Sequence, residues 1–274
     1  MTSKCVNCNS IDFKSYLELR GYSYKRCNAC KLVQLSPLPT IDELKLFYDS
    51  NYYKYNFEEK SADIKTVIKE QNDVQFDVIL RNFHVNDTTK FLDYGCGVGG
   101  FLDTLSLKGN KNIFGFEFNK ISSKLIQDRG YGYVDVYKDN QTFDVITLWD
   151  VAEHLLDPVD VFKLLHSRLN KTGILVIGTA RIDDFVDRTG LGYTMWADPP
   201  AHTILYSREL LFSMLNKAGF DNVKEDTKHT ISNIYNSRAK MLKRLIKKII
   251  FYFKTDRANK RELDASYLIV VAAK

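Results

Sequence analysis

The chain has 274 residues, of which 45% are hydrophobic, and its formal net charge is +5. This length fits one large domain with a small addition, and the composition excludes a globally disordered chain. The mild charge is too small by itself to mark a nucleic-acid-binding protein. The N-terminus lacks the apolar segment of a signal peptide, and no apolar run is long enough to cross a bilayer. We therefore expect a cytoplasmic protein with reduced cysteines.

Four of the five cysteines form two pairs near the N-terminus. Two residues separate Cys5 from Cys8 and Cys27 from Cys30, and 18 residues lie between the pairs. Four thiolates can close a tetrahedral shell around zinc and leave no open position for a substrate, so we predict a structural zinc site. Free thiols or two disulfides are the alternatives. Residues 1–40 should form a zinc-binding ribbon that is too small to fold without its metal.

The rest of the chain is predicted to be a helical connector followed by an α/β domain. In the connector, 41–87, Thr40 is a candidate N-cap with Glu43 three residues on, and apolar residues recur at helical spacing from about residue 61 to 83. Strands and helices then alternate over 88–274, which predicts a doubly wound parallel sheet. The expected strands are 91–94, 112–117, 143–149, 173–178 and 267–272.

A glycine-rich turn joins the strand at 91–94 to the helix that follows it. Its residues run from Asp93 through Gly95 and Gly97. Glycine permits a tight turn and lets a ligand approach the backbone closely. Asp93 could reach the methionine ammonium of S-adenosylmethionine, and Glu117, at the end of the second strand, could accept both ribose hydroxyls. The glycine spacing alone also fits the dinucleotide site of an NAD-dependent oxidoreductase.

Four segments in order resemble the consecutive motifs of class I S-adenosylmethionine-dependent methyltransferases. They are FLDYGCGVGGF, GFE, FDV followed by WDVAEHLLDP, and PPAHTILYS with a later AGF. The resemblance covers about residues 88–274 and implies a Rossmann-like, seven-stranded sheet whose last strand is antiparallel. The cysteine pairs add a resemblance to bacterial methyltransferases that carry a zinc-binding lobe and act on nucleotide sugars or cell-surface glycan precursors.

The resemblance implies how the start of this domain would hold S-adenosylmethionine. Asp93, Gly95 and Gly97 would hold the methionine part. Glu117 would bind the ribose, and Phe118 would flank the adenine. Core packing is the alternative for Phe118.

Four further residues of the implied cofactor site lie around these. Asp135 would lie near the adenine, and Trp149 and Asp150 would line the pocket at the end of the strand at 143–149. Core packing is again the alternative for Trp149. Cys96 is expected to be a small packing residue within the turn.

Two histidines are candidates for a base. Methyl transfer from a sulfonium has a neutral leaving group, so the enzyme mainly positions the nucleophile and excludes water. A hydroxyl acceptor must still lose its proton. His154 follows the strand at 143–149 and His202 follows the strand at 173–178, at the edge where ligands bind in open α/β sheets. Either could be the base, and a purely structural role for both is the alternative.

A metal-assisted reaction is a second interpretation of the same region. Asp150, Glu153 and His154 resemble the acid, acid, histidine cluster that holds a divalent cation in ubiquinone-pathway O-methyltransferases, with Asp where that pattern has Glu. Oxygen and imidazole ligands suit magnesium or manganese. The acceptor would then be a phenolic or quinone-type small molecule.

A basic helix is predicted at 238–254, inside an insertion at 236–262. It carries seven positive charges, no acid and one apolar face. It could lie on an anionic membrane surface, attract an anionic substrate such as a nucleotide sugar, or be a solvated face. The sequence as a whole predicts methyl transfer from S-adenosylmethionine to a hydroxyl or carbon of a nucleotide-linked sugar or glycan precursor. A non-catalytic nucleic-acid-binding module is the remote alternative.

Overall fold

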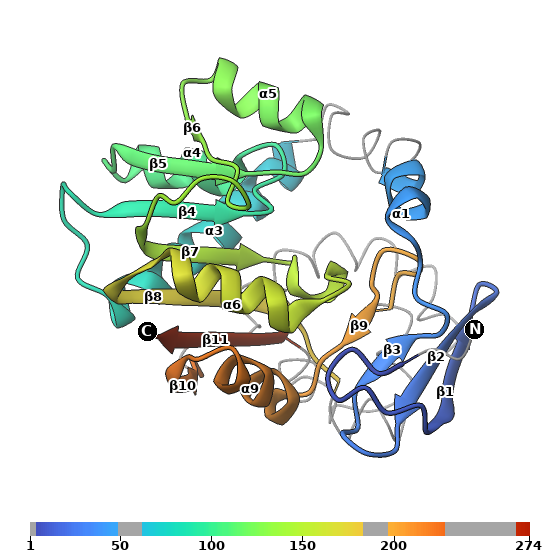
Figure 1. Cartoon of the computed structure of the whole chain (residues 1–274). Helices are drawn as coiled ribbons and strands as arrows, with labels where there is room; N and C mark the ends of the chain where they lie inside the picture. Colours follow the sequence, from blue (N-terminus) through green and yellow to red (C-terminus); the bar gives the residue numbers. More distant parts are fainter. Residues whose placement is uncertain (1–3, 49–61, 183–196, 228–266) are drawn as a thin grey trace, which may run out of the picture.

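The computed structural model of the chain describes residues 4–48, 62–182, 197–227 and 267–274 (Figure 1). The predicted basic helix lies outside these residues. None of the helices in the described part is both long and apolar enough to span a bilayer.

A seven-stranded sheet forms the larger part of the molecule, in the order β10-β11-β8-β7-β4-β5-β6 (Figure 1). The strands from β8 to β6 run parallel, whereas β11 is antiparallel to both of its neighbours. The predicted sheet with an antiparallel last strand is therefore confirmed. Its strands are β4 (Lys90–Tyr94), β5 (Asn112–Phe116), β6 (Gly132–Tyr133), β7 (Phe143–Trp149), β8 (Leu169–Ala180), β10 (Asp221–Glu225) and β11 (Tyr267–Ala273).

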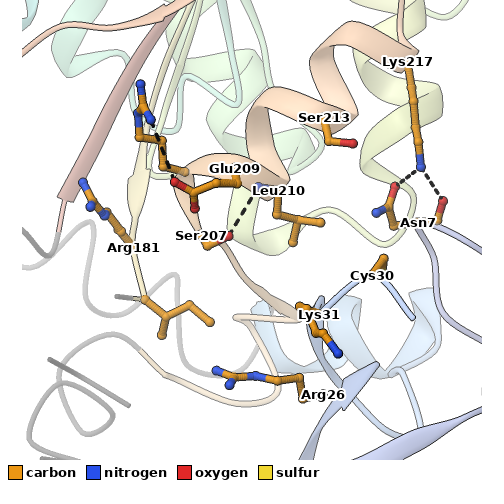
Figure 2. A pocket seen from close by; sticks show the side chains of 12 residues that line it. Asn7, Arg26, Cys30, Lys31, Arg181, Ser207, Glu209, Leu210, Ser213 and Lys217 are labelled. Atoms are coloured by element: carbon orange, nitrogen blue, oxygen red, sulfur yellow. Dashed lines mark hydrogen bonds and ion pairs between the residues drawn. The ribbon is translucent and has the colours of Figure 1, made fainter. Parts of the chain in front are cut away.

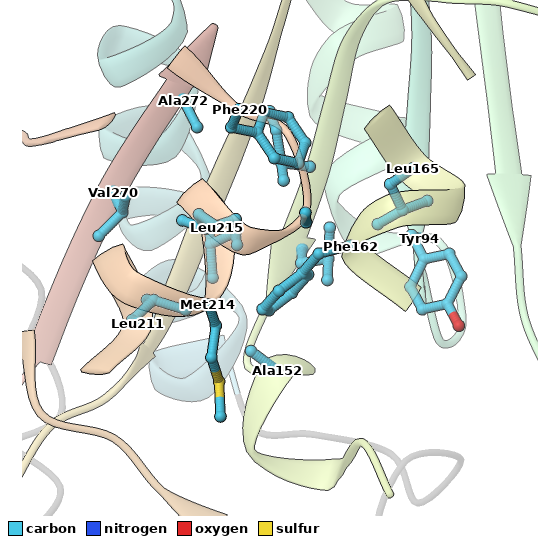
Figure 3. Packing of buried hydrophobic residues seen from close by; sticks show 14 of the residues in the cluster. Tyr94, Ala152, Phe162, Leu165, Leu211, Met214, Leu215, Phe220, Val270 and Ala272 are labelled. Atoms are coloured by element: carbon cyan, nitrogen blue, oxygen red, sulfur yellow. The ribbon is translucent and has the colours of Figure 1, made fainter. Parts of the chain in front are cut away.

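Helices cover both faces of this sheet and bury two separate apolar cores. On one face, α6 and α9 place Phe162 and Met214 against the sheet (Figure 3). On the other face, α3 and α4 contribute Ile79 and Leu102. Runs such as β7 are buried along nearly their whole length, as expected for an inner parallel strand covered on both sides. The helices are α3 (Ala62–Asn82), α4 (Gly100–Leu107), α5 (Lys120–Asp128), α6 (Pro158–Arg168) and α9 (Arg208–Lys217).

The connector begins with a short helix, α1 (Ile41–Phe47), which starts where the sequence predicts it. Thr40 accepts a hydrogen bond from the Glu43 backbone, and the Glu43 side chain accepts one from the Thr40 backbone. This reciprocal capping box satisfies N–H groups that the first turn of a helix leaves unpaired. It also fixes where the chain leaves the N-terminal lobe.

The N-terminal lobe is a small antiparallel sheet in the order β1-β2-β3-β9. The first three strands are β1 (Phe13–Leu19), β2 (Tyr22–Cys27) and β3 (Val33–Leu35). The fourth, β9 (Ile204–Leu205), comes from the α/β domain and pairs with β3. The sequence did not predict this pairing, because the two strands lie about 170 residues apart and each is short. Consequently the lobe is bound to the segment that follows His202.

Candidate functional site

The glycine-rich turn after β4 is hydrogen-bonded to the carboxylate at the end of β5. The backbone N–H of Gly97 donates to Glu117 Oε2 (2.9 Å), and that of Asn119 donates to Oε1 (3.0 Å). A carboxylate can accept about four hydrogen bonds, so Glu117 retains capacity for two hydroxyls. Gly97 has a φ of +53°, and a Cβ there would meet no atom within 4 Å. The turn and Glu117 therefore fit a ribose-bearing ligand that approaches the backbone closely.

Asp93 is buried at the end of β4, beside this turn. Its carboxyl accepts a hydrogen bond from Thr147 Oγ1 on β7 (2.7 Å). Burial raises the pKa of Asp93 to about 7, and the Thr147 hydrogen bond opposes the shift. An ammonium group beside the carboxyl would favour its charged form. This environment suits the predicted role of Asp93 toward the methionine part of the cofactor.

Gly95 couples the turn to the loop that follows β7. Its φ is +77°, and a Cβ there would lie 2.6 Å from Val151 Cγ2. A side chain at this position would therefore strain the backbone and displace Val151. Cys96, the next residue, is buried in the turn.

Phe118 and Trp149 differ in their surroundings. Phe118 is 66% exposed, so it is not a core residue, and its ring edge contacts Phe116. Trp149 is half-buried and packs edge-on against Phe101, with 5.7 Å between ring centroids. Core packing thus describes part of Trp149 but not Phe118. Their roles toward the cofactor stay predictions.

The other two predicted cofactor residues have defined local partners. Asp135 forms an ion pair with Lys138 (2.8 Å). Asp150 has a φ of +54°, and its backbone N–H donates to Gly178 O (2.9 Å) at the end of β8. Both residues lie on segments at the carboxyl ends of the parallel strands, and their contact with a cofactor stays a prediction.

The two candidate bases lie together beside a buried carboxyl group. The rings of His154 and His202 meet edge to face, with centroids 4.7 Å apart. A ring nitrogen of each histidine and a carboxylate oxygen of Glu153 all lie within 4.8 Å of one another. Glu153 accepts a hydrogen bond from Thr179 Oγ1 (2.7 Å), and burial raises its pKa. Because η2 (Ala152–His154) follows β7, the cluster occupies the same sheet edge as the glycine-rich turn.

His154 and His202 are not equivalent as bases. His154 Nδ1 lies 3.0 Å from the carbonyl oxygen of Ala201, which can only accept, so we assign the proton to Nδ1. Burial, with a contribution from His202, lowers the pKa of His154 to about 3. Such a weakly basic imidazole is a poor match for proton abstraction near neutral pH. His154 is thus the weaker of the two candidates, and its ring packs against that of His202.

The structure adds Tyr48 and Tyr24 to this cluster, and neither was predicted from the sequence. Tyr48, just after α1, places its hydroxyl 3.0 Å from His154 Nδ1. Tyr24, on β2, donates a hydrogen bond to the carbonyl of His202 (2.7 Å). Both tyrosines come from segments more than 100 residues away in sequence. No spacing or motif could have linked them to the histidines.

The four N-terminal cysteines converge as predicted. Cys5 Sγ lies 3.4 Å from Cys30 Sγ, and Cys8 Sγ lies 3.6 Å from Cys27 Sγ. All four sulfur atoms are within 4.8 Å of one another. Such a cluster fits a tetrahedral zinc site.

The two cysteine pairs lie on turns with the same hydrogen bonds. The Cys5 carbonyl accepts from Asn9 N and the Cys27 carbonyl from Lys31 N, each across four residues. Asn9 and Lys31 both have a positive φ, of 60° and 68°. Burial raises the pKa of the Cys27 thiol, but backbone and Cys8 hydrogen bonds outweigh it and lower the pKa to about 7. At Cys5 and Cys8 backbone hydrogen bonds act in the same direction, but burial outweighs them and raises the pKa of both thiols. The backbone N–H groups of both turns thus favour the thiolate form that a metal requires.

Comparison with known proteins agrees with this geometry. A family model described as a methyltransferase domain matches residues 63–225. The chain therefore belongs to the methyltransferase domain family, and its sheet has the fold of the class I S-adenosylmethionine-dependent enzymes.

Individual relatives match smaller parts of the chain. A tRNA U34 carboxymethyltransferase from Helicobacter hepaticus is 30% identical over 115 residues, 35% of this chain and 36% of that protein. A ubiquinone biosynthesis O-methyltransferase from Actinobacillus pleuropneumoniae is 28% identical over 106 residues, 33% of this chain and 45% of that protein. The chain thus spans less than half the length of these curated relatives.

A solved structure shares the fold over most of the chain. It is phosphoethanolamine N-methyltransferase 2 from Haemonchus contortus, in complex with phosphomonomethylethanolamine and S-adenosylhomocysteine. The TM-score is 0.56 at 14% identity, and the match covers 87% of this chain and 61% of that one. At this identity the likeness concerns the fold alone.

Proposed function

We propose that the protein transfers a methyl group from S-adenosylmethionine to a hydroxyl or carbon of a nucleotide-linked sugar or related glycan precursor. The observation that carries the proposal is the placement of the Glu153–His154–His202 cluster. It lies at the same sheet edge as the Gly97–Glu117 turn, with the cysteine-rich lobe docked through β9 onto the loop of His202. A methyl donor held by the turn and an acceptor beside His202 would meet at this edge.

In the proposed reaction, Glu117 and the turn hold the donor, and Asp93 in its charged form balances the donor's ammonium. The bound S-adenosylmethionine supplies an electrophilic methyl group with a neutral leaving group. His202 accepts the proton of the acceptor hydroxyl as the oxygen attacks the methyl carbon in line. The carbonyl of His202 is fixed by Tyr24, and its ring packs on His154. These contacts restrict the ring orientation that proton transfer needs.

The test is transfer of labelled methyl from S-adenosylmethionine to nucleotide sugars, catechols and tRNA, with products identified by mass spectrometry. We expect label on a nucleotide sugar. A His202→Ala variant should then lose about a hundredfold in rate, whereas His84→Asn, in the loop after α3, should retain the wild-type rate. The proposed acceptor would be refuted if neither a nucleotide sugar nor a glycan precursor became labelled.

A metal-assisted O-methyltransferase is the second candidate, favoured by the three-residue cluster itself. Two histidines and one carboxylate could bind a divalent cation. The cluster differs from the predicted one, because His202 takes the place expected for Asp150. Chelation by EDTA decides between the candidates when the zinc content is measured in parallel. Turnover of a catechol that is lost while zinc is retained, and restored by magnesium or manganese, would establish the second candidate.

We also propose that Cys5, Cys8, Cys27 and Cys30 bind a structural zinc ion. The two matching turns and the short sulfur–sulfur distances support this proposal. Metal analysis of the purified protein should give about one zinc per chain. Disulfides in freshly purified, unreduced protein would contradict it.

A further inference from the structure

A cavity of about 610 Å³ lies between the cysteine-rich lobe and α9, apart from the Glu153–His154–His202 cluster (Figure 2). The lobe contributes the end of β2 and the second cysteine turn. The α/β domain contributes the two residues that follow β8 and half of the residues of α9. The cavity therefore lies at the junction of the two parts of the molecule, which the pairing of β9 with β3 joins.

The lining of this cavity is strongly basic. Among the described residues that line it, Glu209 is the one acid, and Glu225, which does not line the cavity, pairs with Arg181 and Arg208. Within the described part of the chain, positive charges exceed negative ones by three even when both carboxylates are counted. The basic residues are Arg26, Lys31, Arg181, Arg208 and Lys217.

Two of these side chains are bonded to neutral oxygen atoms. Lys31 Nζ donates to the carbonyl of Asn28 (2.6 Å), and Lys217 Nζ donates to the side chain of Asn7 (2.8 Å). Neither lysine pairs with a carboxylate within the described residues. Their charges are thus oriented by neighbours but not neutralised. Lysine and arginine together in a concave site provide the donors that bind phosphate.

Balancing the zinc site is a simpler role for these charges, because four thiolates around zinc carry a net charge of two negative. That role could apply to Lys31, which follows Cys30 directly. It could also apply to Lys217, which is hydrogen-bonded to Asn7 between Cys5 and Cys8. It does not account for Arg181 and Arg208, which reach the cavity from the α/β domain. The two roles predict different consequences when the lysines are replaced.

We propose that this cavity binds the phosphate groups of the acceptor substrate, as a nucleoside diphosphate carries them. The inference rests on the proposed function and adds the place where the acceptor's anionic part binds. Ser207 lines the cavity and His202 lies five residues before it, on either side of β9. An extended chain of five residues spans at most about 18 Å. One elongated acceptor can therefore place its phosphates in the cavity and its reacting sugar near His202.

The experiment measures binding of pyrophosphate and of UDP to the full chain by calorimetry. The double variant Lys31→Gln/Lys217→Gln is compared with Lys124→Gln/Lys163→Gln, which removes two surface lysines that pair with Asp128 and Asp160 elsewhere. We expect the cavity variant to weaken both ligands about tenfold or more. The control variant should bind like the wild type. Affinity for S-adenosylhomocysteine and zinc content should not change in either variant.

Three results would overturn the inference. The first is that neither probe binds saturably to the wild type, and the second is that both variants weaken binding equally. The third is that the cavity variant loses zinc without a change in its affinity for the probes. The last result would assign the lysines to the metal site. Failure of the proposed function looks different. In that case lysine-dependent pyrophosphate binding persists, but no nucleotide sugar is methylated.

Discussion

The N-terminal lobe and the seven-stranded sheet are stabilised in different ways. The sheet buries apolar side chains on both faces, and the core beneath α3 and α4 contains no residue of the lobe. The core beneath α6 and α9 also takes in Cys5, Cys27 and Leu32 of the lobe. The lobe buries Tyr24, Val33 and Leu35, but these pack against Ile182 and Leu205 of the α/β domain. A lobe of this size lacks enough apolar interior to fold alone. The comparison indicates that the sheet draws most of its apolar interior from its own strands and helices, whereas the lobe depends on its metal and on the surface where it docks.

Loss of the metal should have the largest effect, and it should be confined to the lobe. Zinc binding to such sites contributes roughly 10–16 kcal/mol. Cys27→Ser should therefore abolish zinc binding and leave the lobe susceptible to protease. Methyl transfer should fall about a hundredfold or more, since β3 and Tyr24 would no longer fix the His202 loop. Metal analysis and proteolysis report on the lobe, and binding of S-adenosylhomocysteine reports on the α/β domain. Binding of S-adenosylhomocysteine should survive in Cys27→Ser.

Cys96→Ser is the matched control for that experiment, because Cys96 is the cysteine outside the cluster. Its zinc content should equal that of the wild type. Loss of S-adenosylhomocysteine binding in Cys27→Ser would show that the sheet also depends on the lobe.

Truncation of the sheet core should have the next largest effect. Phe162, fully buried on α6, packs in the core beneath α6 and α9 (Figure 3). Phe162→Ala should lower the free energy of unfolding by about 3–5 kcal/mol. Leu107→Ala, at an 81% exposed position, should change it by less than about 0.5 kcal/mol. Chemical denaturation measures both, and equal effects would refute the assigned packing.

The cofactor turn should be sensitive to a change at Glu117 that leaves the lobe intact. Glu117→Gln removes the charge and one acceptor from the group that holds Gly97 and Asn119. Loss of a charge-assisted hydrogen bond costs about 1.5–3 kcal/mol, so the Kd for S-adenosylhomocysteine should rise about tenfold to a hundredfold. Zinc content should not change. Asp128→Asn on α5 is the control, and calorimetry measures both.

Binding of S-adenosylhomocysteine should strengthen as the pH rises toward 7 and then level off. Folded Asp93 has a pKa near 7, whereas a carboxyl in an unfolded chain titrates near 4. Between these values the folded state holds the extra proton, so ionisation of Asp93 destabilises the free protein as the pH rises. A ligand ammonium favours the ionised carboxyl, so binding below pH 7 releases this proton. Affinity should change by up to about tenfold per pH unit. An Asp93→Asn variant should lack this slope.

The smallest expected effect concerns the contact between the lobe and His202. Tyr24→Phe removes the hydroxyl that donates to the His202 carbonyl. A typical hydrogen bond contributes about 0.5–1.5 kcal/mol, so kcat should fall about two- to tenfold while the zinc content is retained. Tyr22→Phe, on the same strand with a more exposed ring, should leave kcat unchanged. Equal rates in the two variants would indicate that the lobe does not position His202.

Much of the fold follows from local sequence patterns. The buried run at 143–149, the capping box at Thr40 and the cysteine spacing each depend on residues close together in the chain, and each has its predicted structure. The order of strands and helices also predicts that the ends of β4, β5 and β7 share one edge. That is why Asp93 and Glu117 could be assigned to one site.

The sequence by itself therefore determined the fold class, the cysteine cluster and the edge of the sheet where the site lies, because periodicity, spacing and chain order encode them. Tertiary structure alone decided that β9 completes the lobe, that Tyr24 and Tyr48 contact the histidine cluster, and that a basic cavity forms between the two parts. Each of these contacts joins residues more than 100 positions apart. Such contacts depend on the packing of whole elements in three dimensions, which no local pattern specifies.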